Sequence, residues 1–219
     1  MQRVGMFYAT KEGHARQVAE RVGAALKART LDVAVHDVKD ADADAALVRS
    51  DAAVLVGSVH LGKHEPELVA FVKAHREHLD SIPAAFLSVC GAEAGAEQGS
   101  TPEARAKSAE RVGKQLQAFM EATGWHPRHV RPVAAAFVFT HYNALVRCVM
   151  KLIAKSDGLP TDTSRDYDFT DWVALDDQPE GWVDADRDHL IQTDGNLGLS
   201  DPDILKLLAE RLGQKDSPC

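Results

Sequence analysis

A segment that could bind an anion lies near the start of the chain, at residues 9–15. It follows an apolar run, residues 4–8, and precedes an amphipathic helical pattern that begins at His14. A strand that turns through a polar, glycine-containing loop into a helix leaves backbone N–H groups without partners at the start of that helix. Those donors and the helix dipole favour an anion, most often a phosphate. The segment therefore suggests the phosphate site of a nucleotide or a flavin.

Apolar runs and helical patterns alternate along the rest of the chain. The runs expected as strands cover residues 4–8, 31–35, 52–57, 84–90 and 133–139. The patterns expected as helices cover residues 14–30, 41–48, 65–78, 102–120 and 143–156. The polar stretch 91–101 is expected to be a loop. This alternation predicts an α/β domain with a parallel sheet.

Three of the expected strand-to-helix junctions could form one site. In such sheets, ligands bind beyond the carboxyl ends of the strands, at the point where the strand order reverses. The junctions are residues 9–14, 58–64 and 88–92, and each follows an apolar run. Their agreement favours a binding site at this edge more strongly than the first segment does alone.

Composition limits the classes of protein to which the chain can belong. Its 219 residues, 45% of them hydrophobic, suit one generous domain or one domain with an appendage. No apolar run approaches the roughly 20 residues of a membrane helix, and no signal-peptide pattern precedes the first strand, so we expect a cytoplasmic protein. The formal net charge of −8 argues against a nucleic-acid partner.

Cysteine and histidine spacing indicates neither a disulfide framework nor a metal site. Cys90, Cys148 and Cys219 lie far apart, and we expect the first two to be buried as small hydrophobic side chains. His60 and His64 are spaced at i and i+4, but no third ligand accompanies them. They are therefore interpreted as surface or loop histidines.

Several motifs resemble those of flavodoxin-like FMN proteins, and within them those of the menaquinone-dependent protoporphyrinogen IX dehydrogenases. In the first segment, the residues that fit the family pattern are Tyr8, Thr10, Lys11, Glu12, Gly13 and His14. Further similar motifs are Gly57–His64, Ser88-Val89, Gly124-Trp125-His126-Pro127, His141-Tyr142 followed by Arg147 and Met150–Ile153, Thr161-Asp162-Thr163, and Thr170-Asp171-Trp172. The resemblance covers a flavodoxin-like domain at residues 1–175. It leaves residues 176–219 as a C-terminal extension, in which one helix is expected after Asp201.

The resemblance implies a doubly wound sheet of five parallel strands in the order 2-1-3-4-5, with helices on both faces and FMN as the cofactor. The residues that it implies at the FMN site are Thr10, Lys11, Glu12, Gly13, His14, Ala15, Ser58, Val59, His60, Leu61, Gly62, Ser88, Val89, Cys90 and Gly91. Ala9 and Ala15 depart from the family, which tends to have Ser and Thr there. Each lost hydroxyl removes a hydrogen bond worth about 1 kcal/mol, so we expect weaker FMN binding rather than none.

The same resemblance implies an enzyme, a flavin-dependent and quinone-linked dehydrogenase that converts a porphyrinogen to a porphyrin in heme biosynthesis. Two other functions stay open: a flavodoxin-like electron carrier without its own substrate, and a cofactor-poor interaction protein with this fold. The expected partners are a quinone or a redox protein and a porphyrinogen. A peripheral contact at the inner face of the membrane and a homo-oligomer also stay open. No catalytic side chain can be assigned from the sequence.

The helix expected at residues 143–156 carries three basic residues on one face. Arg147, Lys151 and Lys155 are spaced at i and i+4. Arg147 and Lys151 could pair with the propionates of the substrate or with anionic lipid head groups, or the three could be a solvated face. Segment 93–103, which is basic in the best-known relatives, is acidic here, and this departure bears on both roles. Trp172 is expected to anchor the following segment to the domain.

Overall fold

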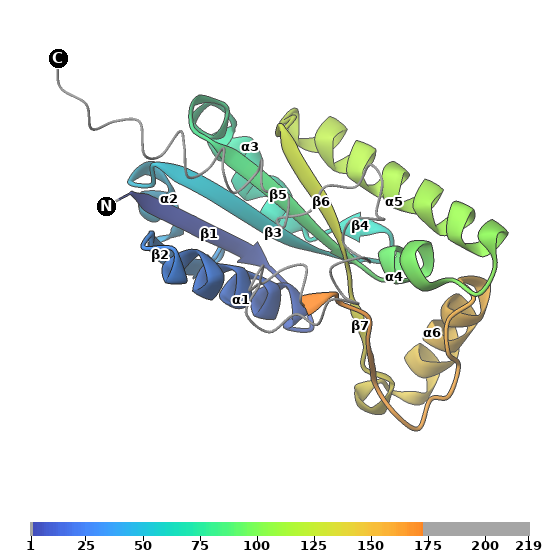
Figure 1. The fold of residues 1–219 in the computed structure, drawn as a ribbon. Coiled ribbons are helices and arrows are strands. Elements are labelled where there is room, and N and C mark those ends of the chain that lie inside the picture. The colour runs from blue at the N-terminus through green and yellow to red at the C-terminus, as the bar shows by residue number, and fades with distance from the viewer. Residues whose placement is uncertain (1, 173–219) are drawn as a thin grey trace, which may run out of the picture.

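Five parallel strands form the centre of the fold, seen in Figure 1. The structure, a computed structural model, describes residues 2–172. The parallel strands are β1 (Arg3–Ala9), β2 (Asp32–Asp37), β3 (Ala52–His60), β5 (Ala84–Cys90) and β6 (His129–Ala134), in the order β2-β1-β3-β5-β6. Counted along the chain, this is the order 2-1-3-4-5, so the predicted fold class is confirmed. A short strand that the sequence does not predict, β4 (Lys63–His64), pairs antiparallel with the end of β3.

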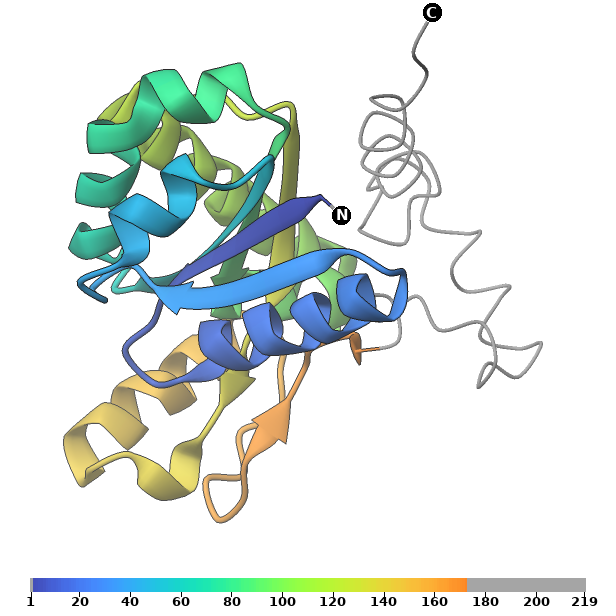
Figure 2. The same cartoon turned by 90° about the vertical axis from the view of Figure 1, so that its left-hand side faces the viewer.

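Helices cover both faces of this sheet (Figure 2). The helices against the sheet are α1 (His14–Ala28), α2 (Ala43–Val48), α3 (Pro66–Ser81) and α5 (Pro102–Thr123). Side chains alternate between the faces of a strand, so Met6 packs with α1 whereas Phe7 packs with α2 and α3. Helices cover both faces of β1, which explains why its sequence is a nearly continuous apolar run.

Residues 91–101, expected as a loop, contain a helix, α4 (Gly91–Gln98). The prediction was wrong because two glycines and a polar composition obscure a run of Ala and Glu, which are good helix formers. One of these glycines has a packing role. A Cβ added to Gly95 would lie 2.5 Å from Ser108 Oγ and 2.8 Å from Asp157 Cβ, so α4 can approach α5 only with glycine there.

The apolar run 133–139 does not form one strand, as the sequence suggested. The chain leaves the main sheet after Ala134, and its next residues form β7 (Ala136–Phe137), which pairs with β8 (Tyr167–Asp168). The apolar residues beyond Ala134 instead fill a separate hydrophobic cluster, which includes Phe137, Phe139 and Phe169. The run is therefore apolar throughout because its first residues pack in the core of the main sheet and its later residues pack in this second cluster.

Residues 136–172, called the outer element below, project beyond one end of the sheet (Figures 1 and 2). They comprise β7, a short 3₁₀ helix η1 (Phe139–His141), α6 (Ala144–Ser156) and β8. Asn143 begins α6 by accepting a hydrogen bond at Oδ1 from the backbone N–H of Val146, at 3.0 Å. Cys148 on this helix is exposed, which corrects the expectation that it is buried.

Within residues 2–172, no helix combines the length and the apolar character needed to cross a membrane. The helix expected after Asp201, and the extension that contains it, lie outside the described residues.

Candidate functional site

The three predicted junctions meet at one edge of the sheet. In the register of the parallel strands, Ala9 of β1 pairs with Gly57 of β3, and Gly57 pairs with Ser88 of β5. The strands thus end side by side, and the chain turns to β2 on one side of β1 and to β3 on the other. This is the reversal of strand order at which such sheets bind ligands.

The first junction presents uncapped backbone donors at the start of α1. Gly13 precedes the helix with φ of 89°, a left-handed conformation that glycine adopts without strain, and no side chain caps the first turn. The backbone N–H of Gly13 donates to Thr10 Oγ1 at 3.0 Å, which holds the turn. Ala9 and Ala15 are both buried in the hydrophobic core. The groups available to an anion here are therefore the backbone amides and the Thr10 hydroxyl.

The second junction is a hairpin that carries an exposed apolar side chain. Leu61 and Gly62 form the tip between β3 and β4 with φ of 49° and 80°, and Leu61 is 92% exposed. Ser58 fixes the base of the hairpin, because its single hydroxyl proton is shared between Glu65 Oε1 at 3.2 Å and Ala9 O at 3.4 Å. Val59 and His60 are half-buried. An exposed leucine at the mouth of a site suits contact with a flat apolar ring.

The third junction, residues 88–92, contributes mainly buried side chains. Ser88, Val89 and Cys90 are all buried, and Gly91 opens α4 where a Cβ would lie 2.6 Å from the Phe137 ring. Burial raises the pKa of Cys90 to about 12, so its thiol stays protonated.

His64 corrects the interpretation of a surface histidine. Its side chain is 6% exposed, and Nε2 lies 2.9 Å from the Ser88 hydroxyl oxygen. The ring packs against Phe86 and Phe119. Burial lowers the pKa of His64 to about 4, so the imidazole is neutral at pH 7. The turn that β4 makes back onto β3 buries it, and residue spacing does not reveal that turn.

The outer element packs on the first junction. Tyr142 donates its hydroxyl to Glu12 Oε2 at 3.2 Å, and His14 Nε2 lies 2.7 Å from Thr170 Oγ1. Burial lowers the pKa of His14. A cavity of about 220 Å³ remains between the two parts, lined by Glu12, His14, Gln17, Ala136, Val138, Asp166, Tyr167 and Asp168. The imidazole of His14 thus contacts the outer element, while its backbone N–H belongs to the first turn of α1.

Trp172 adds to the contact between the outer element and α1. Its indole Nε1 donates to Asp168 Oδ2 at 2.8 Å, and the guanidinium of Arg21 lies 5.2 Å from the ring centroid. The ring also packs against the α1 side of the core. These contacts hold Trp172 itself on the domain, whereas the segment that it was expected to anchor lies outside the described residues.

Arg147 and Lys151 lie apart from the three junctions, on α6. The Arg147 guanidinium donates to the carbonyl oxygens of Phe139, at 3.0 Å, and Tyr142, at 2.9 Å. It therefore ties η1 to α6, a structural role that the sequence does not indicate. Lys151 is exposed. The substrate role of these two residues stays a prediction.

Two acidic residues on α4, Glu93 and Glu97, have raised pKa values. Glu93 is 7% exposed, and burial raises its pKa. Glu97 reaches solvent, yet the protein surrounds enough of its carboxyl group to raise the pKa to about 7, and repulsion from Glu93 adds to this effect. Because residues 91–101 were expected to be a loop, no sequence pattern predicted that these two carboxyl groups interact.

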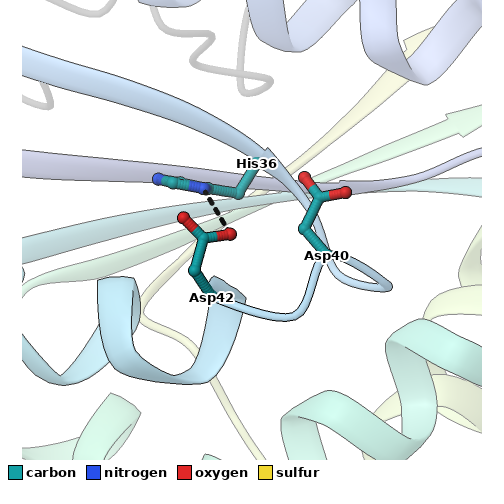
Figure 3. Close-up of side chains that lie close together, drawn as sticks. All are labelled: His36, Asp40 and Asp42. Atoms are coloured by element: carbon teal, nitrogen blue, oxygen red, sulfur yellow. Dashed lines mark ion pairs between the residues drawn. The ribbon is translucent and has the colours of Figure 1, made fainter.

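A separate group of side chains, His36, Asp40 and Asp42, lies close together at the end of β2 (Figure 3). His36 Nδ1 is 3.8 Å from Asp42 Oδ1, and the His36 ring stacks on Phe7. Asp40 accepts the backbone N–H of Asp37 and so stabilises the turn. These contacts account for the three side chains within the fold, and we assign no metal to them.

Comparison with known proteins identifies the family. The flavodoxin domain pattern matches residues 6–164. Two curated relatives named protoporphyrinogen IX dehydrogenase [quinone] are similar to this chain. The Leishmania major protein is 26% identical over 78% of this chain and 70% of its own length, and the Escherichia coli K12 protein is 28% identical over 76% and 87%. A solved flavodoxin variant from Pseudomonas aeruginosa has 15% identity and a TM-score of 0.42, over 71% of this chain and 97% of that one.

The geometry of the switch point fits FMN. Uncapped amides at the start of α1 and the Thr10 hydroxyl suit its phosphate, and the exposed Leu61 suits its ring. The domain match and this fit agree with the resemblance found in the sequence. The chain therefore belongs to the flavodoxin domain family, and its cofactor is FMN.

Proposed function

We propose that this protein is an FMN-dependent oxidoreductase that converts a porphyrinogen to a porphyrin and passes the electrons to a quinone. The observation that carries the proposal is the shared name of the curated relatives, which match more than three quarters of this chain. The outer element supports it further, because the family match continues into that element, to residue 164. A part that packs on the cofactor junction is well placed to shape a substrate site.

When bound, FMN supplies the electron chemistry, and the protein supplies binding and electrostatics. The amides at the start of α1 and the Thr10 hydroxyl hold the phosphate. Leu61 covers apolar surface and reduces access of water. Tyr142 and Thr170 hold the outer element against this junction through Glu12 and His14, so they are positioning residues.

The proposal is tested by anaerobic assay of the FMN-loaded protein with protoporphyrinogen and a water-soluble menaquinone analogue. We expect turnover that requires both compounds. Leu61→Ser should lower the turnover, whereas Val48→Ser, which changes another exposed apolar residue, on α2, should leave it unchanged. Reduction of the flavin by a protein reductase only, without porphyrinogen turnover, would instead establish an electron carrier.

A further inference from the structure

The apolar face of α6 points away from the protein. Leu145, Val149 and Leu152, at positions i, i+4 and i+7, form one stripe and are 76%, 45% and 63% exposed. With Val146, they make four of the six large hydrophobic side chains that are exposed in residues 2–172. A surface helix ordinarily buries its apolar stripe and exposes its polar face. Helix α6 instead leaves this apolar stripe exposed.

The opposite face of α6 already holds the helix in place. Ala154 is fully buried, and Met150 packs against the cluster of the outer element. Arg147 binds backbone carbonyls beside it, and Asp157 at the end of the helix pairs with Arg111 of α5. Helix α6 is therefore anchored without its outward stripe, which has no role in packing among the described residues.

Basic side chains lie along one edge of the stripe. Lys151 and Lys155 are exposed on one side of it, and α6 contains no acidic residue. Lys107 of α5 joins them at the end of the helix, where its Nζ donates to Ser156 Oγ at 3.1 Å. The Asp162 carboxylate, which interacts with the charge of Lys151, also pairs with Arg165 Nε at 3.6 Å, so Arg165 offsets its charge. An apolar stripe bordered by lysines matches the interface of a bilayer that contains anionic lipids.

We propose that α6 docks on the surface of an anionic membrane, with its leucines among the acyl chains and its lysines at the head groups. The stripe is too small for a second copy of the chain. A helix of 13 residues is about 20 Å long and 10 Å wide, so the stripe offers roughly 200 Å², against about 800 Å² per partner in a stable dimer. A bilayer requires no matching shape, so a small stripe with local positive charge suffices.

Docking through α6 brings the cofactor junction close to the bilayer, because the outer element contacts Glu12 and His14. This consequence rests on the proposed function. An isoprenoid quinone is apolar and resides in the membrane, so an enzyme that reduces it gains from standing at that surface. The docking itself is independent of catalysis and can be measured without substrate.

The test is sedimentation of the full chain with vesicles of phosphatidylcholine alone, or of equimolar phosphatidylcholine and phosphatidylglycerol. We expect binding to the anionic vesicles, weakened by salt. Lys151→Glu with Lys155→Glu should weaken it by at least about tenfold, because each lysine contributes to the attraction. The matched control, Lys39→Glu with Lys73→Glu, changes the net charge equally at two exposed positions outside the outer element.

Leu145→Ser with Leu152→Ser tests the stripe separately, with Val48→Ser as the exposed apolar control. Thermal melting of each variant establishes that it is folded. Equal binding by the α6 variants and the controls, or no binding to anionic vesicles, overturns the proposal. So does a stable dimer in free solution that Leu145→Ser with Leu152→Ser converts to monomers. Vesicle binding without porphyrinogen turnover would leave the docking intact and remove the proposed function.

Discussion

His64 is a buried base, and burial couples its protonation to folding. Its pKa is about 4 in the folded protein, against an ordinary value of 6.5. Well above pH 6.5 the imidazole is neutral in both states. As the pH falls from 6.5 to 4, the unfolded chain binds a proton that the folded protein excludes, so the free energy of unfolding decreases. The largest decrease from this group is about 3 kcal/mol.

Replacing His64 by Gln removes this titration and keeps a polar group beside Ser88. We expect the free energy of unfolding of the variant, measured by urea at a series of pH values, to fall less steeply between pH 6.5 and 4 than that of the unchanged protein. Identical slopes for the two proteins would show that folding does not lower the pKa of His64.

Single-residue burial is what the sequence predicts least well here. Cys90 was expected to be buried and is, because it ends a strand covered on both faces. Cys148 was expected to be buried and is exposed, because its helix presents apolar residues outward. Helical periodicity indicates that a stripe exists, but not which side of it faces the protein.

At the scale of elements, a buried ion pair fastens the outer element to the domain. Arg111 Nη2 of α5 lies 2.5 Å from Asp157 Oδ2, and the Asp157 side chain is inaccessible to solvent. Arg111→Met would leave this carboxylate buried without its partner, which costs about 3 to 5 kcal/mol. We therefore expect a large decrease in the free energy of unfolding, measured by urea denaturation.

Helix α5 offers a matched control for this change. Lys114 pairs with Glu110 at 2.6 Å, but both side chains are largely exposed. Lys114→Met should cost much less than Arg111→Met, because water screens such an exposed pair. Adding Asp157→Asn to Arg111→Met should recover part of the loss, since it removes the buried charge. A similar cost for Arg111→Met and Lys114→Met would mean that the buried pair does not hold the outer element.

Elements were predictable where periodicity was long and regular, as in α1 and α5. They were not where two elements share one apolar run. The break between β6 and β7 depends on β8, whose partner residues lie about thirty positions later. The helix α4 depends on the close approach of Gly95 to α5. Both depend on contacts between residues far apart in the chain, which local sequence patterns do not predict.

For the whole molecule, the alternation of strands and helices predicted a parallel sheet, and the resemblance to flavodoxin-like proteins supplied its strand order. The apolar runs predicted which strand ends meet, because the carboxyl ends of parallel strands lie at one edge of the sheet. The packing of residues 136–172 on that junction did not follow from the sequence. It depends on two side-chain contacts, Tyr142 with Glu12 and Thr170 with His14, between residues far apart in the chain.

The fold as a whole should be more stable with FMN than with riboflavin, because the phosphate is the group that the amides at the start of α1 bind. FMN at a hundred times its Kd stabilises the folded state by about 2.7 kcal/mol, which raises the Tm by about 5 to 10 °C for a domain of this size. Riboflavin lacks the phosphate, so at the same concentration it should raise the Tm by much less.

Thr10→Val removes a hydroxyl from the junction and should reduce the difference between the Tm values measured with the two ligands. Thr101→Val, which removes the cap of α5, should lower both Tm values and keep the difference. Equal stabilisation by FMN and riboflavin would place the phosphate away from this junction.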